Sequence, residues 1–162
     1  MNVRATLTIR FVALMLLVDS TGAFAKQAQL RLTPPEITAL AKVGPGAGTS
    51  GVAGIQSTVL SGDPSKSGPY TIEIRVPAHT RIAAHDHRDE RSAVVVSGQW
   101  YLGYGKTASE AAVKQLSPGS FYTEPAGEAH FAMTKDKPAV VYISGYGPTS
   151  TTYADPANAP RP

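Results

Sequence analysis

Apolar and polar residues alternate in short runs along most of this chain, and the runs are rich in β-branched and aromatic residues. This alternation is typical of half-buried strands, whose side chains point to opposite faces in turn. Turn-forming stretches such as Ser61-Gly62-Asp63-Pro64 and Ser117-Pro118-Gly119 separate the runs. We therefore predict an all-β fold, an antiparallel barrel or sandwich, with strands at residues 56–60, 70–76, 93–96, 100–103, 120–123, 130–133 and 140–144.

Helical signals are few. Thr33-Pro34-Pro35-Glu36 has the pattern of a capping box with proline at the first helical position, which predicts a short helix through about Lys42. Thr107 and Glu110 form a second such pattern, and residues 107–115 are the only other predicted helix. Residues 44–54 are rich in glycine and are expected to form a loop.

The first 25 residues have the features of a secretory signal peptide. Arg4 and Arg10 are followed by an apolar run at residues 11–18, and Ala23-Phe24-Ala25 is a small-x-small cleavage site. The apolar run is shorter than the ~20 residues that cross a bilayer. We predict cleavage after Ala25, no membrane span afterwards, and a periplasmic or secreted protein.

The remaining 137 residues suit one domain. We divide them into an N-terminal helix and glycine-rich arm (residues 26–54), a barrel (residues 55–153) and an extended tail (residues 154–162). The whole chain has a net charge of +3, which falls to +2 without the signal, and its Lys and Arg residues form no cluster. A nucleic-acid partner is therefore not expected.

Histidines are the residues that point to chemistry, because the chain has no cysteine and hence no thiolate ligand or thiol nucleophile. His85 and His87 are two residues apart, a spacing that places both imidazoles on one face of a strand. A divalent cation bound there needs a third ligand from another strand, and His130 is the only histidine downstream. Taken alone, a His-x-His pair is more often two solvent-facing side chains.

Residues 79–98 and 119–134 together resemble the two sequence motifs of the cupin superfamily. In the first motif His85, His87 and Gly98 are in register, and in the second Gly119, Pro125, Gly127 and His130 are. The resemblance implies a cupin-type antiparallel β-barrel (a double-stranded β-helix, or jelly roll) with a short N-terminal helix. It also implies one divalent transition metal (iron, manganese, nickel, copper or zinc) held by His85, His87 and His130, and a homodimer, since cupin barrels often pair.

The sequence departs from the family pattern where a glutamate ligand is expected. Arg91 occupies that position, and Glu90 precedes it. Adjacent residues on a strand point to opposite faces, so the shift is not neutral. Either a bulge turns Glu90 inward as a fourth ligand, or Arg91 occupies the site; the register set by Gly98 favours the second.

Several residues near the motifs have two interpretations. Arg91 could bind an acidic substrate or form a surface ion pair with Asp89 or Glu90. Glu124 could replace the missing oxygen ligand or act as an acid at the rim, although such a residue is more often a solvated charge. His79, which replaces the first glycine of the motif, could be an extra ligand but is more simply a turn residue; Thr134 replaces its final asparagine.

The fold by itself does not decide the function. The resemblance favours a metal-dependent enzyme, dioxygenase- or isomerase-like, acting on a small and in one interpretation anionic substrate, with Arg91, Glu90 and Glu124 as candidate catalytic residues. The alternative is a periplasmic cupin that binds a metal or small ligand without turnover. A third interpretation is a barrel that has lost its metal and serves as a dimer scaffold.

Overall fold

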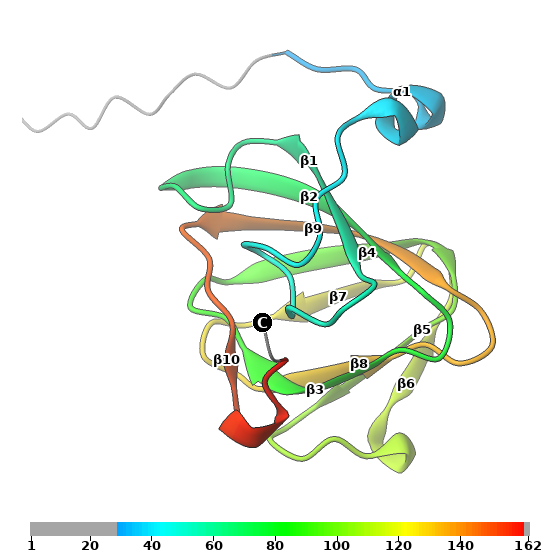
Figure 1. Cartoon of the computed structure of the whole chain (residues 1–162), viewed down its shortest axis with the longest axis vertical. Coiled ribbons are helices and arrows are strands. Elements are labelled where there is room, and N and C mark those ends of the chain that lie inside the picture. Colours follow the sequence, from blue (N-terminus) through cyan, green and yellow to red (C-terminus); the bar gives the residue numbers. More distant parts are fainter. Residues whose placement is uncertain (1–28, 161–162) are drawn as a thin grey trace, which may run out of the picture.

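The structure, a computed structural model, describes residues 29–160. The predicted signal peptide and its cleavage site lie outside the described residues. Ten strands form two five-stranded antiparallel sheets that face each other and enclose the core (Figure 1). The predicted all-β barrel is confirmed.

The first sheet has the strand order β1-β2-β9-β4-β7. Its strands are β1 (Gln56–Ser61), β2 (Gly68–Val76), β9 (Ala139–Gly147), β4 (Arg91–Gly98) and β7 (Phe121–Glu124). Each was predicted within a few residues. In β2, β4 and β9 the buried apolar side chains alternate along the strand, as expected for strands with one face in the core.

The second sheet has the order β10-β3-β8-β5-β6. Its strands are β10 (Thr152–Tyr153), β3 (Arg81–Asp86), β8 (His130–Met133), β5 (Trp100–Tyr104) and β6 (Lys114–Leu116). Strands β5 and β8 were predicted; β6 and β10 are so short that alternation cannot be read from them.

The helix predicted at residues 107–115 is wrong. That stretch forms one 3₁₀ turn, η1 (Glu110–Ala112), and then enters β6, where Gln115 pairs with Tyr101 of β5. Sheet pairing supplies hydrogen bonds and packing that outweigh a weak local helix propensity.

The N-terminal helix α1 (Pro34–Ala39) begins as predicted. Glu36 accepts hydrogen bonds from the backbone N–H and the hydroxyl of Thr33, at 2.7 and 2.6 Å. The helix ends before Lys42, because Leu40 is extended and the chain then pairs Val43 with Ser57. The proline-rich tail contains one further 3₁₀ turn, η2 (Pro156–Asn158).

From α1 the chain runs across the barrel before it reaches β1 (Figure 1). Within residues 29–160 no helix is long and apolar enough to cross a bilayer.

Candidate metal centre

A bulge in β3 brings the first histidine to the barrel interior. Ile82 pairs with Ala132, but His85, three residues later, pairs with His130, only two residues earlier on β8. The extra residue reverses the alternation of faces, so Ile82 and His85 both line the same internal cavity. A bulge was one of the two possibilities for Glu90. The structure has a bulge in β3 instead, where it turns His85 toward the barrel interior.

His87 lies one residue beyond the end of β3 and is oriented by the C-terminal part of the chain. Its Nδ1 is 2.8 Å from the carbonyl oxygen of Ser150. The Thr151 hydroxyl is 3.3 Å from the same nitrogen. His87 reaches the site through these contacts rather than through regular strand geometry.

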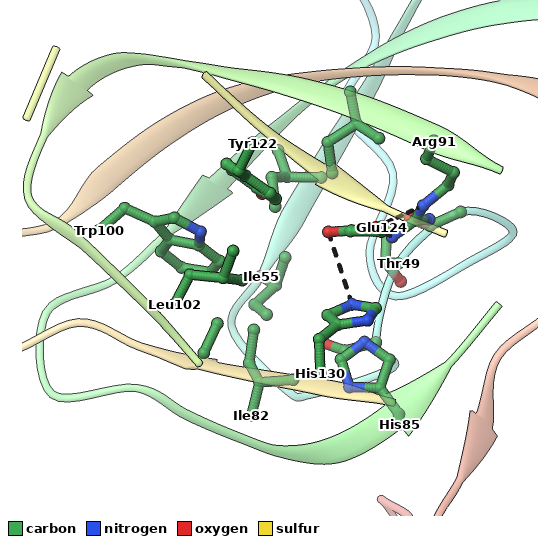
Figure 2. A pocket seen from close by; sticks show the side chains of 15 residues that line it. Thr49, Ile55, Ile82, His85, Arg91, Trp100, Leu102, Tyr122, Glu124 and His130 are labelled. Carbon is green, nitrogen blue, oxygen red and sulfur yellow. Dashed lines mark hydrogen bonds and ion pairs between the residues drawn. The ribbon is translucent and has the colours of Figure 1, made fainter. Parts of the chain in front are cut away.

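The three histidines converge as predicted from the sequence. One potential ligand atom from each of His85, His87 and His130 lies within 4.8 Å of the others, and all three side chains are buried. The ring centroids are 4.5 Å apart for His85 and His130, 4.9 Å for His85 and His87, and 5.2 Å for His87 and His130. Figure 2 shows His85 and His130 side by side, below Glu124 and Arg91.

Hydrogen bonds at Nδ1 determine which nitrogen faces the site. Besides the bond of His87, Nδ1 of His85 is 2.8 Å from the Ala83 carbonyl oxygen, and Nδ1 of His130 is 3.4 Å from that of Glu128. A carbonyl oxygen only accepts, so Nδ1 of His85 and Nδ1 of His87 carry the proton and the Nε2 atoms of these two residues keep their lone pairs. Nε2 of His87 is buried and has no hydrogen-bond partner among the described residues.

Burial keeps these imidazoles neutral. Burial, followed by the nearby charge of His130, lowers the pKa of His85 to about 4. Burial and the Arg91 guanidinium lower the pKa of His87 to about 2, and burial also lowers the pKa of His130. Neutral imidazoles with inward lone pairs are the form in which histidine binds a metal.

Arg91 and Glu124 form a buried ion pair beside the histidines. They face each other across β4 and β7. Arg91 donates to Glu124 Oε2 from Nε, at 2.6 Å, and from Nη2, while its Nη1 donates to the Gly48 carbonyl at 3.0 Å. Glu124 Oε1 is 3.5 Å from Nε2 of His130, and Oε2 is 3.8 Å from Nε2 of His87.

The pair stays ionised although it is buried. Burial alone would raise the pKa of Glu124, but the Arg91 charge outweighs it and brings this pKa down to about 2. Conversely, burial opposes the charge of Arg91, and Glu124 raises the pKa of that guanidinium. Glu124 is therefore a carboxylate inside the barrel, not a solvated charge at its rim.

Of the two neighbouring residues in question, Arg91 points inward and Glu90 is exposed. Glu90 is therefore not placed as a fourth ligand, because the regular pairing of Arg91 with Glu124 and Gly145 leaves no bulge there. Arg91 forms no surface pair with Asp89 or Glu90; Asp89 instead accepts a hydrogen bond from the Tyr70 hydroxyl at 2.7 Å. His79 is exposed in the turn before β3, with a positive φ of 58°, and lies away from the histidine cluster.

Residues 44–54, which we name the covering loop, close this end of the barrel. Besides the Gly48 contact, the Thr49 carbonyl accepts from the Thr151 hydroxyl at 2.8 Å, and the Ser50 carbonyl from the Tyr153 hydroxyl at 2.6 Å. The cavity beneath has a volume of about 20 Å³. Its apolar wall includes Ile55, Ile74, Trp100, Leu102, Tyr122 and Ile143.

Sequence reasoning predicted this glycine-rich segment only as a loop and missed its place at the site. Its contacts with the site are made by backbone carbonyls, for which no residue type is diagnostic.

No protein-family model matches this sequence, and comparison with curated proteins gives no match. Solved structures do match. The polyketide cyclase RemF from Streptomyces resistomycificus has a TM-score of 0.57 at 17% identity, with 80% of this chain and 89% of that chain covered. An RmlC-like cupin from Shewanella frigidimarina has a TM-score of 0.55 at 14% identity, covering 75% and 94%.

The DMSP lyase DddQ from Ruegeria pomeroyi has a TM-score of 0.52 at 18% identity, with 62% of this chain covered. This chain spans about half the length of the DMSP lyases it matches, 47% and 53%. Identities this low show the fold alone. The chain has the fold of the cupin superfamily, as its sequence motifs predicted.

Proposed function

We propose that this chain binds one divalent transition metal through His85, His87 and His130 and is a metal-dependent enzyme acting on a small molecule. The observation that carries the proposal is the convergence of three buried, neutral imidazoles whose Nδ1 atoms face backbone carbonyls. The buried Nε2 of His87, without a hydrogen-bond partner in the described part of the chain, fits a metal ligand. When bound, a first-row metal supplies Lewis-acid or oxygen-activating chemistry.

The residues around the histidines define what the chain itself contributes. Tyr122 lines the cavity, and burial raises the pKa of its phenol well above the usual value, so it remains a proton donor. Glu124 is an acceptor beside the histidines. The apolar side chains around them exclude water and strengthen polar interactions within the cavity.

A small, largely apolar substrate fits this site better than an acidic one. All three guanidinium nitrogens of Arg91 already donate to Glu124 or Gly48, and its charge is paired with the Glu124 carboxylate. In this arrangement the guanidinium therefore offers no unpaired charge to a substrate anion. The matched folds include a polyketide cyclase and a DMSP lyase, both named for reactions on small organic molecules. These names support a small organic substrate without identifying it.

The alternative function, metal or small-ligand binding without turnover, is favoured by the closed cavity. Its volume of about 20 Å³ has room for about one water molecule. A larger substrate enters only if the covering loop moves. A metal with an exchangeable position supports the enzyme, and a closed coordination sphere supports the binding protein.

We also propose a periplasmic or secreted location and a homodimer. The signal-like residues 1–25 support a periplasmic or secreted protein. The homodimer is supported by analogy with cupin barrels.

Metal analysis of three purified proteins tests the assignment. The wild type and His79→Asn, which replaces a histidine outside the site, are expected to carry about one metal ion per chain, whereas His85→Ala/His87→Ala is expected to carry none. Equal metal content in all three would overturn the proposal. Cobalt(II) spectra with and without azide then separate the two functions, since only an open site gives a shift on adding azide.

A further inference from the structure

The proposed metal centre has three nitrogen ligands, and the inference of a fourth ligand rests on that proposed function. A carboxylate commonly completes such a set, because oxygen and imidazole ligands together suit first-row divalent ions. The residue at the position expected for it is Arg91, whose charge would repel a cation. A second carboxylate lies directly across the sheet from Arg91: Glu124 on β7.

The two oxygens of Glu124 have different surroundings. Both hydrogen bonds from Arg91, through Nε and Nη2, go to Oε2. Oε1 receives neither of these bonds and lies 3.5 Å from Nε2 of His130 (dashed line in Figure 2), whereas Oε2 is the oxygen nearer to His87, at 3.8 Å from its Nε2. The separation of Oε1 from His130 is long for a hydrogen bond.

The same separation is close to that of two atoms bound to one ion. Two ligand atoms that are each about 2.1 Å from an ion lie about 3.0 Å apart at an angle of 90° and about 3.4 Å apart at a tetrahedral angle, so both open and closed coordination spheres place two ligands near this distance. Glu124 is also only 3% exposed, so its charge must be compensated by groups inside the barrel. Arg91 compensates it on one side, and a cation among the histidines would compensate it on the other.

We propose that Glu124 is the fourth, monodentate ligand of the metal through Oε1, and that Arg91 is a positioning residue that holds Oε2. In this chain the carboxylate lies one strand across the sheet, on β7, and an arginine occupies the facing position on β4. Because Arg91 neutralises one carboxylate charge, a divalent ion bound here keeps more positive charge than it would beside an unpaired glutamate.

A purely structural pair is the competing interpretation. Arg91 and Glu124 would then stabilise each other, and the histidines alone would hold the metal. The two interpretations predict different effects on metal binding when the carboxylate is changed while the barrel remains folded.

Titration of the metal-free protein with cobalt(II), followed by visible absorption and calorimetry, distinguishes them. Glu124→Asp keeps a charge beside Arg91 but shortens the side chain, and Glu124→Gln removes the charge. Both are expected to weaken cobalt binding by at least about tenfold and to change the d–d spectrum. Glu90→Gln, which alters the exposed neighbouring carboxylate, is expected to match the wild type.

Arg91 is tested with two variants that leave Glu124 intact. Arg91→Met is expected to lose roughly 10- to 100-fold in affinity, as for other groups that orient a ligand. Arg91→Lys, which keeps the charge without the fork of donors, is expected to recover part of that loss. Circular dichroism checks that each variant is folded, and Glu124→Asp decides the matter if Glu124→Gln does not fold.

The outcomes separate this inference from the proposed function. Wild-type affinity and spectrum in a folded Glu124→Asp would overturn the fourth ligand but leave the histidine site intact. Equal affinity for Arg91→Met and Arg91→Lys would overturn the positioning role. If the wild type does not bind cobalt, or His85→Ala/His87→Ala binds as the wild type does, the proposed function itself fails.

Discussion

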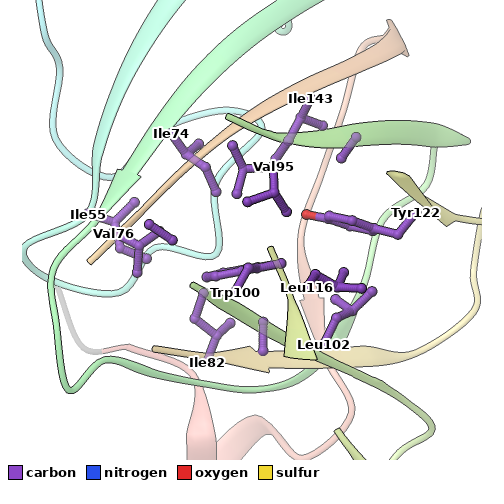
Figure 3. Close-up of a cluster of buried hydrophobic side chains, with 14 of the residues drawn as sticks. Ile55, Ile74, Val76, Ile82, Val95, Trp100, Leu102, Leu116, Tyr122 and Ile143 are labelled. Atoms are coloured by element: carbon purple, nitrogen blue, oxygen red, sulfur yellow. The ribbon is translucent and has the colours of Figure 1, made fainter. Parts of the chain in front are cut away.

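The interior of this barrel contains two regions of opposite character. One is a cluster of apolar side chains that includes Val76, Val95 and Leu116 (Figure 3). The other, under the covering loop, holds three histidines and an ion pair. Figure 2 shows two of these histidines, His85 and His130, with Arg91 and Glu124. The side chains of both regions are almost fully buried, but only the first gains free energy simply by leaving water.

The polar region has to be stabilised by its own contacts. Each imidazole is held by a backbone carbonyl, and Arg91 and Glu124 compensate for each other's loss of hydration. Apolar residues of similar volume at these positions would stabilise a barrel at least as well. We infer that the polar region is retained for chemistry and the apolar region for stability.

The largest expected effect comes from breaking the ion pair in the polar region. Glu124→Leu leaves the guanidinium of Arg91 buried and unpaired, and is expected to lower the free energy of unfolding by about 3–5 kcal/mol. Urea denaturation followed by tryptophan fluorescence measures this change. Arg91→Met/Glu124→Leu, which removes both charges, is expected to recover most of the loss, and a double variant as unstable as the single one would contradict this account.

Truncation in the apolar region is expected to have a slightly smaller effect and to leave metal binding unchanged. Ile72 is 0% exposed and packs in the core cluster. Ile72→Ala is expected to lower the free energy of unfolding by about 2–5 kcal/mol through lost burial and a cavity. Cobalt affinity in the folded variant should equal that of the wild type; a large loss would mean that the two regions are coupled.

The apolar region is also the part of the molecule that the sequence predicts best. Alternating side chains on β2, β4 and β9 follow the period of a strand, which depends only on local geometry. The short strand β6 could not be predicted in this way, because the pairing of Gln115 with Tyr101 is a property of the assembled sheet.

The histidine triad could be predicted because its spacing matches a motif. The inward position of Arg91 could be predicted because Arg91 stands where the motif has a glutamate ligand. For Glu124 the sequence left open a ligand, an acid at the rim or a solvated charge, and did not predict its burial against Arg91. Its burial depends on the register of β7 against β4, which places it opposite Arg91. The bulge between Ile82 and His85, and the carbonyl contacts of the covering loop, have no sequence signature either.

The two regions should also respond differently to pH in the metal-free protein. Folding lowers the pKa of His85 to about 4 and of His87 to about 2, against about 6.5 in an unfolded chain. Below pH 6.5 the unfolded state therefore binds more protons, and the free energy of unfolding falls as the pH falls toward 4. The expected slope is roughly 1.4 kcal/mol per pH unit for each such histidine.

Urea denaturation at several pH values between 7 and 4.5 measures this slope. Ile72→Ala should parallel the wild type from a lower starting point, since no titrating group is changed. His85→Gln should have a shallower slope. A slope unchanged in His85→Gln would show that the acid sensitivity arises outside the polar region.

The smallest expected effect on stability accompanies the loss of the proposed metal binding, and it sharpens the contrast between the two regions most. Nε2 of His87 is buried without a hydrogen-bond partner among residues 29–160, and such a group costs about 1–3 kcal/mol. His87→Leu removes that group along with the Nδ1 contact to Ser150. The two changes oppose each other, so the free energy of unfolding of the metal-free protein should change by no more than about 1 kcal/mol.

With cobalt present, however, the wild type should melt at a higher temperature and His87→Leu should not. If the variant lost several kcal/mol without metal, His87 would belong to the structural part of the interior, and the division between a stabilising core and a binding site would not hold at this position.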